Sequence, residues 1–202
     1  MAQIKAKLME YGLQFPESSN WTKIFIASLL DINMGSRELG IVRDRQIARL
    51  KGLMDEVLFY DAEIRALSKC PTYKEDAAIL ETIPGVGTIT AMRLLLELGD
   101  FRRFGSAGAI ASYSGLTPSQ YSSGDSVRMG RISRCGRPKI RELLIEASWN
   151  LIRWDSGMKA IYLDLSKRRD KKRAIVAIGR KLLIIMRAMV LGGTKYQKRP
   201  MF

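Results

Sequence analysis

The sequence predicts a mainly α-helical protein. Apolar residues recur at helical intervals along most of the chain, Pro and Gly separate the periodic segments, and the alternating patterns typical of strands are nearly absent. Hydrophobic residues make up 47% of the 202 residues, which is enough to form a buried core. We expect three regions: a helical continuation of an upstream region over residues 1–35, a long helix over residues 36–70, and a compact domain over residues 71–202.

The first two regions are predicted from periodicity. Short helical patterns cover residues 4–13 and 21–30, and the segment 36–68 contains no Pro until Pro71 ends it. An a/d seam of about three heptads runs along this long segment, and its members are Leu50, Leu53, Val57, Tyr60, Ile64 and Leu67. A coiled coil would make the chain a homo-oligomer through the 36–70 helix. An ordinary amphipathic helix packed on its own domain explains the same spacing equally well.

The compact domain is predicted to hold five helices and one long loop over residues 115–137. The helices are expected over residues 76–82, 90–98, 106–113, 138–154 and 171–190. Trp149, Trp154 and Tyr162 fall at helical spacing and are predicted to anchor the core.

Positive charge is concentrated in the second half of the chain. Residues 101–202 hold 22 Lys and Arg against 6 acidic residues, a net charge of +16, whereas residues 1–100 have a net charge of −2. A phosphate backbone is the commonest partner for such a surface, although a merely solvated basic face is the alternative. The apolar run over residues 182–191 is too short to span a bilayer, so we expect nucleic acid and no membrane.

The residue types exclude several chemistries. The chain has no His, which excludes His-based general bases and most zinc sites. Its two cysteines, Cys70 and Cys135, lie in unrelated contexts and predict a reducing, cytoplasmic compartment. Acidic residues such as Asp55 and Asp61 lie on helical faces among basic ones, where ion pairing explains them. We therefore assign no metal ligand and no cofactor to this chain.

Residues 83–88, Ile-Pro-Gly-Val-Gly-Thr, lie between two predicted helices and indicate a helix-hairpin-helix. Glycines permit a tight turn, and the backbone N–H groups at the start of the following helix attract a phosphate oxygen without reading a base. Gly85, Gly87 and Thr88 are therefore candidate nucleic-acid contacts. A plain corner between two helices is the alternative.

A Ser- and Gly-rich loop over residues 112–124 comes before a series of basic side chains. Guanidinium groups at close spacing bind phosphate oxygens in pairs and stabilise a phosphoryl transition state. The loop alone is typical of a solvated turn, and a serine without an adjacent base is a weak nucleophile candidate. The predicted phosphate contacts are Arg128, Arg131, Arg134, Arg137, Lys139 and Arg141.

Two runs carry a resemblance to a known family. They are IPGVGTITA at residues 83–91 and GAIASYSGLTPSQYSSGDSVRMGRISRCGRPKIRELLIEAS at residues 108–148. They resemble the C-terminal domain of the insertion-sequence transposase family numbered one hundred and ten, which is related to Piv-type DNA invertases. Its best-known members are guided by a bridge RNA, so the resemblance implies DNA as a partner, together with a guide RNA.

The resemblance also implies a site. Ser123, directly before Gly124, would be the recombination nucleophile that forms a covalent phosphoserine link to DNA, with Ser122 as the adjacent alternative. Ser112 and Ser114 rank lower. Asp125 departs from the family pattern, because it places a negative charge beside the proposed nucleophile.

Family members place a metal-binding RuvC-like half before this domain, and we expect that half to be absent here. Mg²⁺ is therefore expected only together with that half. The chain alone is expected to bind nucleic acid without recombining it, as the DNA-binding part of a transposase. A non-catalytic DNA-binding or dimerisation module that acts as a regulator is the alternative.

Overall fold

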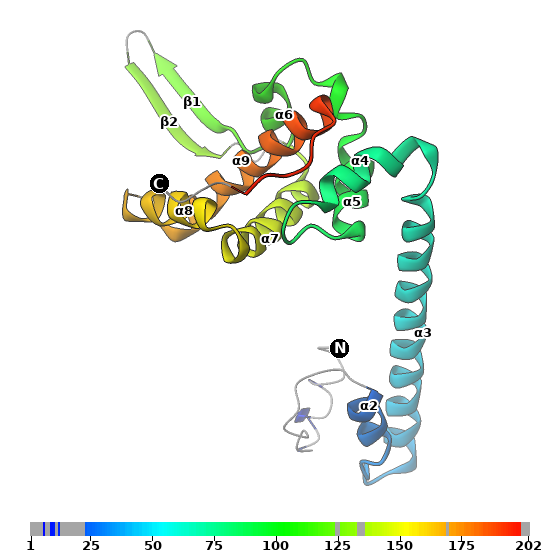
Figure 1. Cartoon of the computed structure of the whole chain (residues 1–202). Coiled ribbons are helices and arrows are strands. Elements are labelled where there is room, and N and C mark those ends of the chain that lie inside the picture. Colours follow the sequence, from blue (N-terminus) through cyan, green and yellow to red (C-terminus); the bar gives the residue numbers. More distant parts are fainter. Residues whose placement is uncertain are drawn as a thin grey trace. The chain divides into compact units, whose positions relative to one another are not determined.

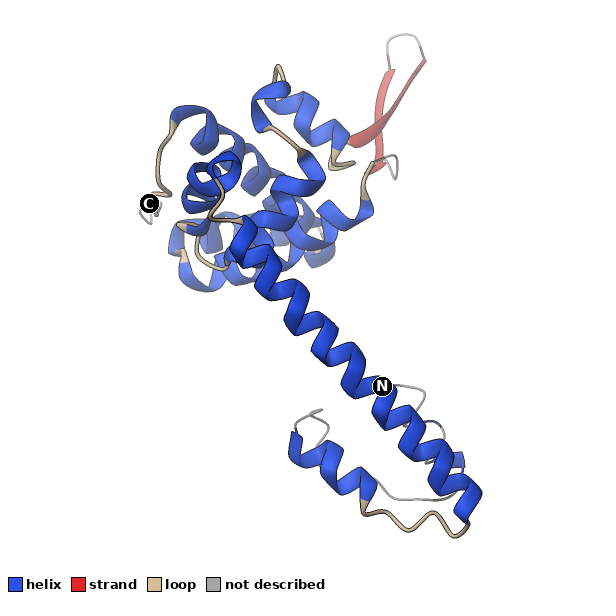
Figure 2. Cartoon of the chain, turned by 90° about the vertical axis from the view of Figure 1, so that its right-hand side faces the viewer, coloured by secondary structure: helices blue, strands red, loops and turns tan. Residues whose placement is uncertain are grey.

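A computed structural model of the whole chain describes residues 6, 9, 10, 12, 23–123, 126–132, 136–168 and 170–198. At residues 23, 120–123, 126–129 and 131 it describes the backbone alone. Over these ranges the chain folds into eight α-helices, one short 3-10 helix and a single two-stranded sheet (Figures 1 and 2). The predicted mainly α class is confirmed. The helix predicted over residues 4–13 lies almost wholly outside the described residues.

The chain divides into two compact units, Met1–Glu63 and Ile64–Phe202. The first unit contains α2 (Lys23–Leu30) and most of α3 (Arg37–Leu67), which is the predicted long helix. Its small core joins three buried residues of α2 to two of α3: Phe25, Ile26, Leu29, Ile47 and Leu50. The hydroxyl of Ser36 accepts the backbone N–H of Leu39 at 3.2 Å, which caps the start of α3.

The predicted a/d seam of α3 is divided into three parts. Leu50 is buried in the core of the first unit, whereas Ile64 and Leu67 pack against the core of the second. Between them the seam is open to solvent, and the exposed fractions of Leu53, Val57 and Tyr60 are 50%, 59% and 60%. Packing within the chain therefore explains the two ends of the seam but not its middle.

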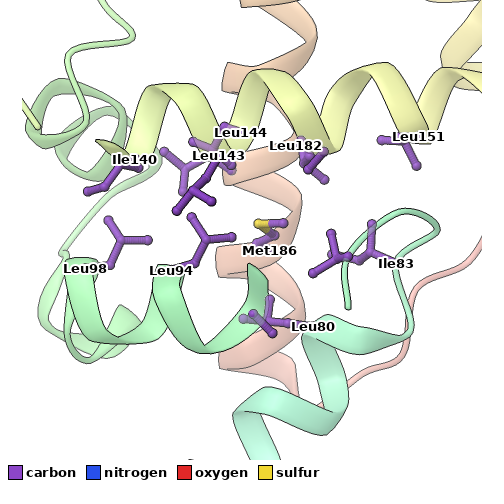
Figure 3. Close-up of a cluster of buried hydrophobic side chains, with 14 of the residues drawn as sticks. Leu80, Ile83, Leu94, Leu98, Ile140, Leu143, Leu144, Leu151, Leu182 and Met186 are labelled. Atoms are coloured by element: carbon purple, nitrogen blue, oxygen red, sulfur yellow. The ribbon is translucent and has the colours of Figure 1, made fainter. Parts of the chain in front are cut away.

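The second unit is built around α9 (Lys171–Gly192), which lies against α4, α6, α7 and α8. The other elements are α4 (Pro71–Glu81), α5 (Thr88–Leu98), the 3-10 helix η1 (Phe101–Arg103), α6 (Ala107–Tyr113), α7 (Pro138–Trp154) and α8 (Ser156–Arg168). Figure 3 shows Leu94 and Leu98 of α5 facing Ile140 and Leu144 of α7, with Met186 of α9 beside them. No helix in the described ranges has the length and apolar character that a membrane crossing requires.

The predicted helix over 138–154 matches α7 at both ends, but α8 was not predicted. Its start depends on Asp155, which is fully buried and whose carboxylate accepts the backbone N–H of Met158 at 2.7 Å. The same carboxylate accepts the hydroxyl of Tyr196 at 2.7 Å, which fastens the C-terminal segment to the junction of α7 and α8. A cap of this kind lets a new helix begin directly after Trp154.

The aromatic anchors were predicted only in part. Tyr162 is buried, as expected, whereas Trp149 and Trp154 are 42% and 66% exposed, so their predicted core role is wrong. The prediction that Trp149 and Trp154 lie in the core was based on their helical spacing alone. In the structure the ring centres of Trp149 and Tyr162 lie 5.6 Å apart, with the two rings in an edge-to-face arrangement.

Candidate nucleic-acid interface

The segment predicted as a loop over residues 115–137 contains an antiparallel hairpin. Strand β1 (Pro118–Ser123) pairs with β2 (Ser126–Ile132), and the register is irregular between Pro118 and Gln120. Figure 1 shows the hairpin extending away from the helices of the second unit. The sequence signal for it was the dipeptide Gly124-Asp125 between two short runs, which is typical of two-residue hairpin connections.

The hairpin spreads the predicted site residues along its length. Ser123 ends β1 and pairs with Ser126, and Arg128 pairs with Tyr121, so these backbone positions lie together at the far end. A strand rises about 3.3 Å per residue, which places Ser123 roughly 17 Å along β1 from Pro118. Arg131 precedes Ile132, the partner of Pro118, at the base. Arg134 and the residues next to Ser123, Gly124 and Asp125, lie outside the described residues.

The lower-ranked serines lie on the helical side of the hairpin. The hydroxyl of Ser114 is buried and donates to the backbone oxygen of Ile110 at 2.8 Å. That hydroxyl is therefore held inside the domain. Ser112 is exposed on α6.

Two of the predicted basic contacts lie at the start of α7. Lys139 is exposed, and Arg141 is half-buried. The Nη1 atom of Arg141 is buried and has no hydrogen-bond partner within the described part of the chain. A buried charged donor without an acceptor is unfavourable, and an anionic oxygen would satisfy it.

Arg137 is already engaged within the protein. Its Nη1 donates to a carboxylate oxygen of Glu97 on α5 at 3.1 Å, and its guanidinium lies 5.6 Å from the ring centre of Tyr113 on α6. The hydrogen bond to Glu97 raises the pKa of Arg137 above its ordinary value. The guanidinium of Arg103 lies over the same ring at 4.7 Å.

The predicted helix-hairpin-helix is formed by α4, α5 and the turn between them, and its two glycines differ. Gly85 has a φ of +87°, and a Cβ added to it would lie 2.3 Å from the Cβ of Asn150 on α7. Gly85 is therefore required where the turn packs against α7. Gly87, by contrast, has no atom within 4 Å of an added Cβ and caps α5 without a side-chain hydrogen bond. The backbone N–H groups at the start of α5, beginning with Thr88, therefore lie on the side of the turn that neighbouring atoms leave uncrowded.

Further basic side chains line the junction of α8 and α9. They are all exposed, and they are Lys167, Arg168, Lys171, Lys172 and Arg173. Of this group, Arg168 lies 3.6 Å from Asp164. Arg102, in contrast, is bound by Asp76 through two hydrogen bonds of 2.9 and 3.0 Å, which raise its pKa above the ordinary value. The charge of the second half is thus divided between internal ion pairs and exposed cations.

In the described ranges, no group of three or more Cys, Asp or Glu side chains is arranged to hold a metal ion. These residues do not fit the Mg²⁺ that the resemblance assigns to a RuvC-like half.

The second unit is a basic helical domain with a helix-hairpin-helix and a projecting hairpin, which is the class of domain that suits a protein that handles nucleic acid. Residues 77–163 match the family model described as Transposase IS116/IS110/IS902 family. The chain therefore carries the C-terminal domain of this transposase family, as the sequence motifs indicated.

Relatives agree with this assignment. The chain is 34% identical over 149 residues to the pilin gene-inverting protein of Moraxella bovis, covering 72% of this chain and 46% of that protein. It is 30% identical over 206 residues to the transposase for insertion sequence element IS1111A of Coxiella burnetii, covering 96% of this chain and 54% of that protein. The chain thus spans about half the length of these relatives.

The two turn glycines allow a matched test of the helix-hairpin-helix. Gly85→Ala should lower the free energy of unfolding by about 1–3 kcal/mol, because its Cβ meets Asn150 and its φ is positive. Gly87→Ala should change it by less than about 1 kcal/mol, because space is open there. Urea unfolding followed by circular dichroism measures both, and equal losses would contradict the packing role of Gly85.

Proposed function

We propose that this domain binds DNA during transposition and presents Ser123 as the nucleophile of strand recombination. The family supports a role in transposition. The observation that carries the proposal is the position of Ser123, which ends β1 on a hairpin that leaves a strongly basic helical domain (Figure 1). A backbone position at the end of such an arm can reach a phosphodiester that the body of the domain holds.

The proposed step is a transesterification. The Ser123 Oγ attacks the phosphorus of a DNA phosphodiester, and the new P–Oγ bond forms as the bond from phosphorus to one sugar oxygen breaks. The serine proton passes to water, and the displaced sugar oxygen takes up a proton and leaves as a hydroxyl group. A second sugar hydroxyl reverses the step and joins a new strand, because the phosphoserine ester keeps the energy of the broken bond.

The phosphate backbone would be held by backbone N–H groups and by cationic side chains. On the helical body these are the N–H groups at the start of α5 at Gly87 and Thr88, the exposed ammonium of Lys139, and the Nη1 of Arg141, which has no hydrogen-bond partner among the described residues. Arg128 and Arg131, whose backbone positions lie on strand β2 of the hairpin, would contribute further cationic contacts to the phosphates. A guide RNA is a second polyanion that the same surface would bind.

DNA binding should weaken steeply with salt. Each phosphate contact releases counterions, so Lys139→Gln and Arg141→Gln should each reduce the slope of log K against log salt by about 1. Fluorescence anisotropy with a labelled duplex at several NaCl concentrations measures this. Arg102→Gln is the matched control, because Asp76 already binds that guanidinium. Affinity that does not change with salt would rule out backbone binding.

Ser123→Ala should abolish covalent protein–DNA adducts, a loss of more than about a thousandfold, because no other group replaces the attacking oxygen. The assay supplies the RuvC-like half of a relative as a separate polypeptide and detects the adduct on a denaturing gel. Ser122→Ala is the matched control and should retain the adduct. Adduct formation that survives Ser123→Ala would contradict the assignment of Ser123 as the nucleophile. Loss of the adduct in Ser122→Ala alone would identify Ser122 as the nucleophile.

A second candidate function, self-association through α3, is favoured by the exposed middle of its seam. Leu53, Val57 and Tyr60 form an apolar stripe that nothing in the described chain covers. Three seam residues at this spacing are what a second copy of the helix would pack against. A module of this kind would act as a dimerising regulator or as the dimer contact of the recombinase.

Val57→Asp should shift the full chain toward the monomer, because a carboxylate at the centre of the stripe would be buried in the dimer contact. Sedimentation velocity at micromolar concentrations measures the shift. Ala62→Asp, on another exposed face of α3, should leave the distribution unchanged. A wild-type chain that is monomeric throughout this range would eliminate the second candidate.

A further inference from the structure

The two chain segments that lead into and out of the hairpin cross at a pair of glycines. Gly115, with a φ of +65°, lies before β1, and Gly136, with a φ of +138°, lies after β2. A Cβ added to Gly136 would lie 2.6 Å from the backbone nitrogen of Gly115 and 2.8 Å from its Cα. The segments therefore approach more closely than a side chain on Gly136 would permit.

The incoming segment is fixed to α6. The backbone N–H of Leu116 donates to the oxygen of Ala111 at 2.9 Å, and that of Gly115 donates to the oxygen of Ser112 at 2.9 Å. The side chain of Leu116 is buried in the core of the second unit. The backbone at the start of the hairpin is thus held by hydrogen bonds and by packing.

The outgoing segment is fixed by Arg137, which follows Gly136. Its hydrogen bond reaches Glu97 on α5, and its guanidinium lies against the Tyr113 ring on α6. The Tyr113 ring also contacts the guanidinium of Arg103, whose Nε donates to the backbone oxygen of Leu98 at 3.0 Å. One side chain therefore connects the end of the hairpin segment to two helices.

The extensive contacts that β1 and β2 make are with each other and not with the helices. Their direction must then be set where they leave the helices. With Ser123 roughly 17 Å from Pro118, a tilt of about 10° at the base would move it by about 3 Å. Displacements of about 1 Å already reduce a reaction rate by about a hundredfold.

We propose that Gly115, Gly136, Arg137, Glu97 and Tyr113 form a neck that fixes the direction in which the hairpin presents Ser123. Arg137 and Gly136 are positioning residues in this arrangement, and Arg137 acts through Glu97 and Tyr113 rather than on phosphate. The inference rests on the proposed function of Ser123 for its consequence, but the neck itself can be tested without recombination.

The direct test measures backbone amide order parameters by ¹⁵N relaxation on the full chain. In the wild type, hairpin amides at residues 120–123 should be close to the rigid value of about 0.85, and in Arg137→Gln or Gly136→Ala they should fall below about 0.6. The values for α7 and α9 should not change. Glu97→Gln should have the same effect as Arg137→Gln, and the double variant should be no worse than either single one.

Matched controls separate the neck from general damage. Arg102→Gln breaks a comparable exposed ion pair away from the hairpin, and Gly105→Ala adds a Cβ where no atom lies within 4 Å. Both should leave the hairpin rigid. If Gly136→Ala does not fold, the Arg137 and Glu97 variants decide the matter.

The outcomes for the neck and for the nucleophile are distinguishable. Wild-type hairpin amides below about 0.6, or amides that stay rigid in Arg137→Gln and Glu97→Gln, would overturn the neck whatever Ser123 does. A mobile hairpin in these variants, together with adducts that survive Ser123→Ala, would support the proposed neck and contradict the assignment of Ser123 as the nucleophile. In the adduct assay, Arg137→Gln should reduce adduct formation, and exchanging the charges in Arg137→Glu with Glu97→Arg should restore it.

Discussion

The packing of α9 against α7 is the contact on which the rest of the second unit depends. Ile178, Leu182 and Met186 of α9 are fully buried, and Leu144 of α7 lies among them. Burial of side chains of this size stabilises a fold by about 1.5–3 kcal/mol each. Because α7 begins at Pro138, directly after Arg137, the same contact holds the base of the hairpin in place. Helix α7 therefore couples the core of the second unit to the position of the hairpin.

The sequence predicted those elements whose signals are local. Pro138 at the first turn and an apolar face along the helix defined α7, and Gly99 after the last residue defined the end of α5. Helix α8 was missed because Asp155-Ser156-Gly157 is typical of a turn, and only the fold shows Asp155 capping Met158. The hairpin was missed for another reason. The residues of β1, Pro118–Ser123, do not alternate between apolar and polar, and that alternation is the signal by which strands are recognised.

For the candidate site, the sequence indicated which residue types are present but not which of their side chains form ion pairs with one another. It placed Ser123 beside a series of basic side chains and predicted Arg137 to be one of the phosphate contacts. Arg137 is instead paired with Glu97, 40 residues earlier in the chain, and Arg102 with Asp76, 26 residues earlier. Arg187 binds the backbone oxygen of Phe104. Pairings over such separations depend on how the helices pack, so only the three-dimensional structure can divide the charge into internal ties and exposed surface.

A projecting hairpin solves one physical problem and creates another. An arm that packs little on the body can present a polar backbone end to a nucleic-acid groove, and a two-stranded ribbon is narrow enough to fit one. The extensive backbone contacts of its two strands are with each other and not with the helices. Direction must then come from its base, where backbone contact is closest and where an ion pair adds a second attachment. This is why Gly136, which bears no side chain, and Arg137, which bears a long one, can stand next to each other at the same point of the fold.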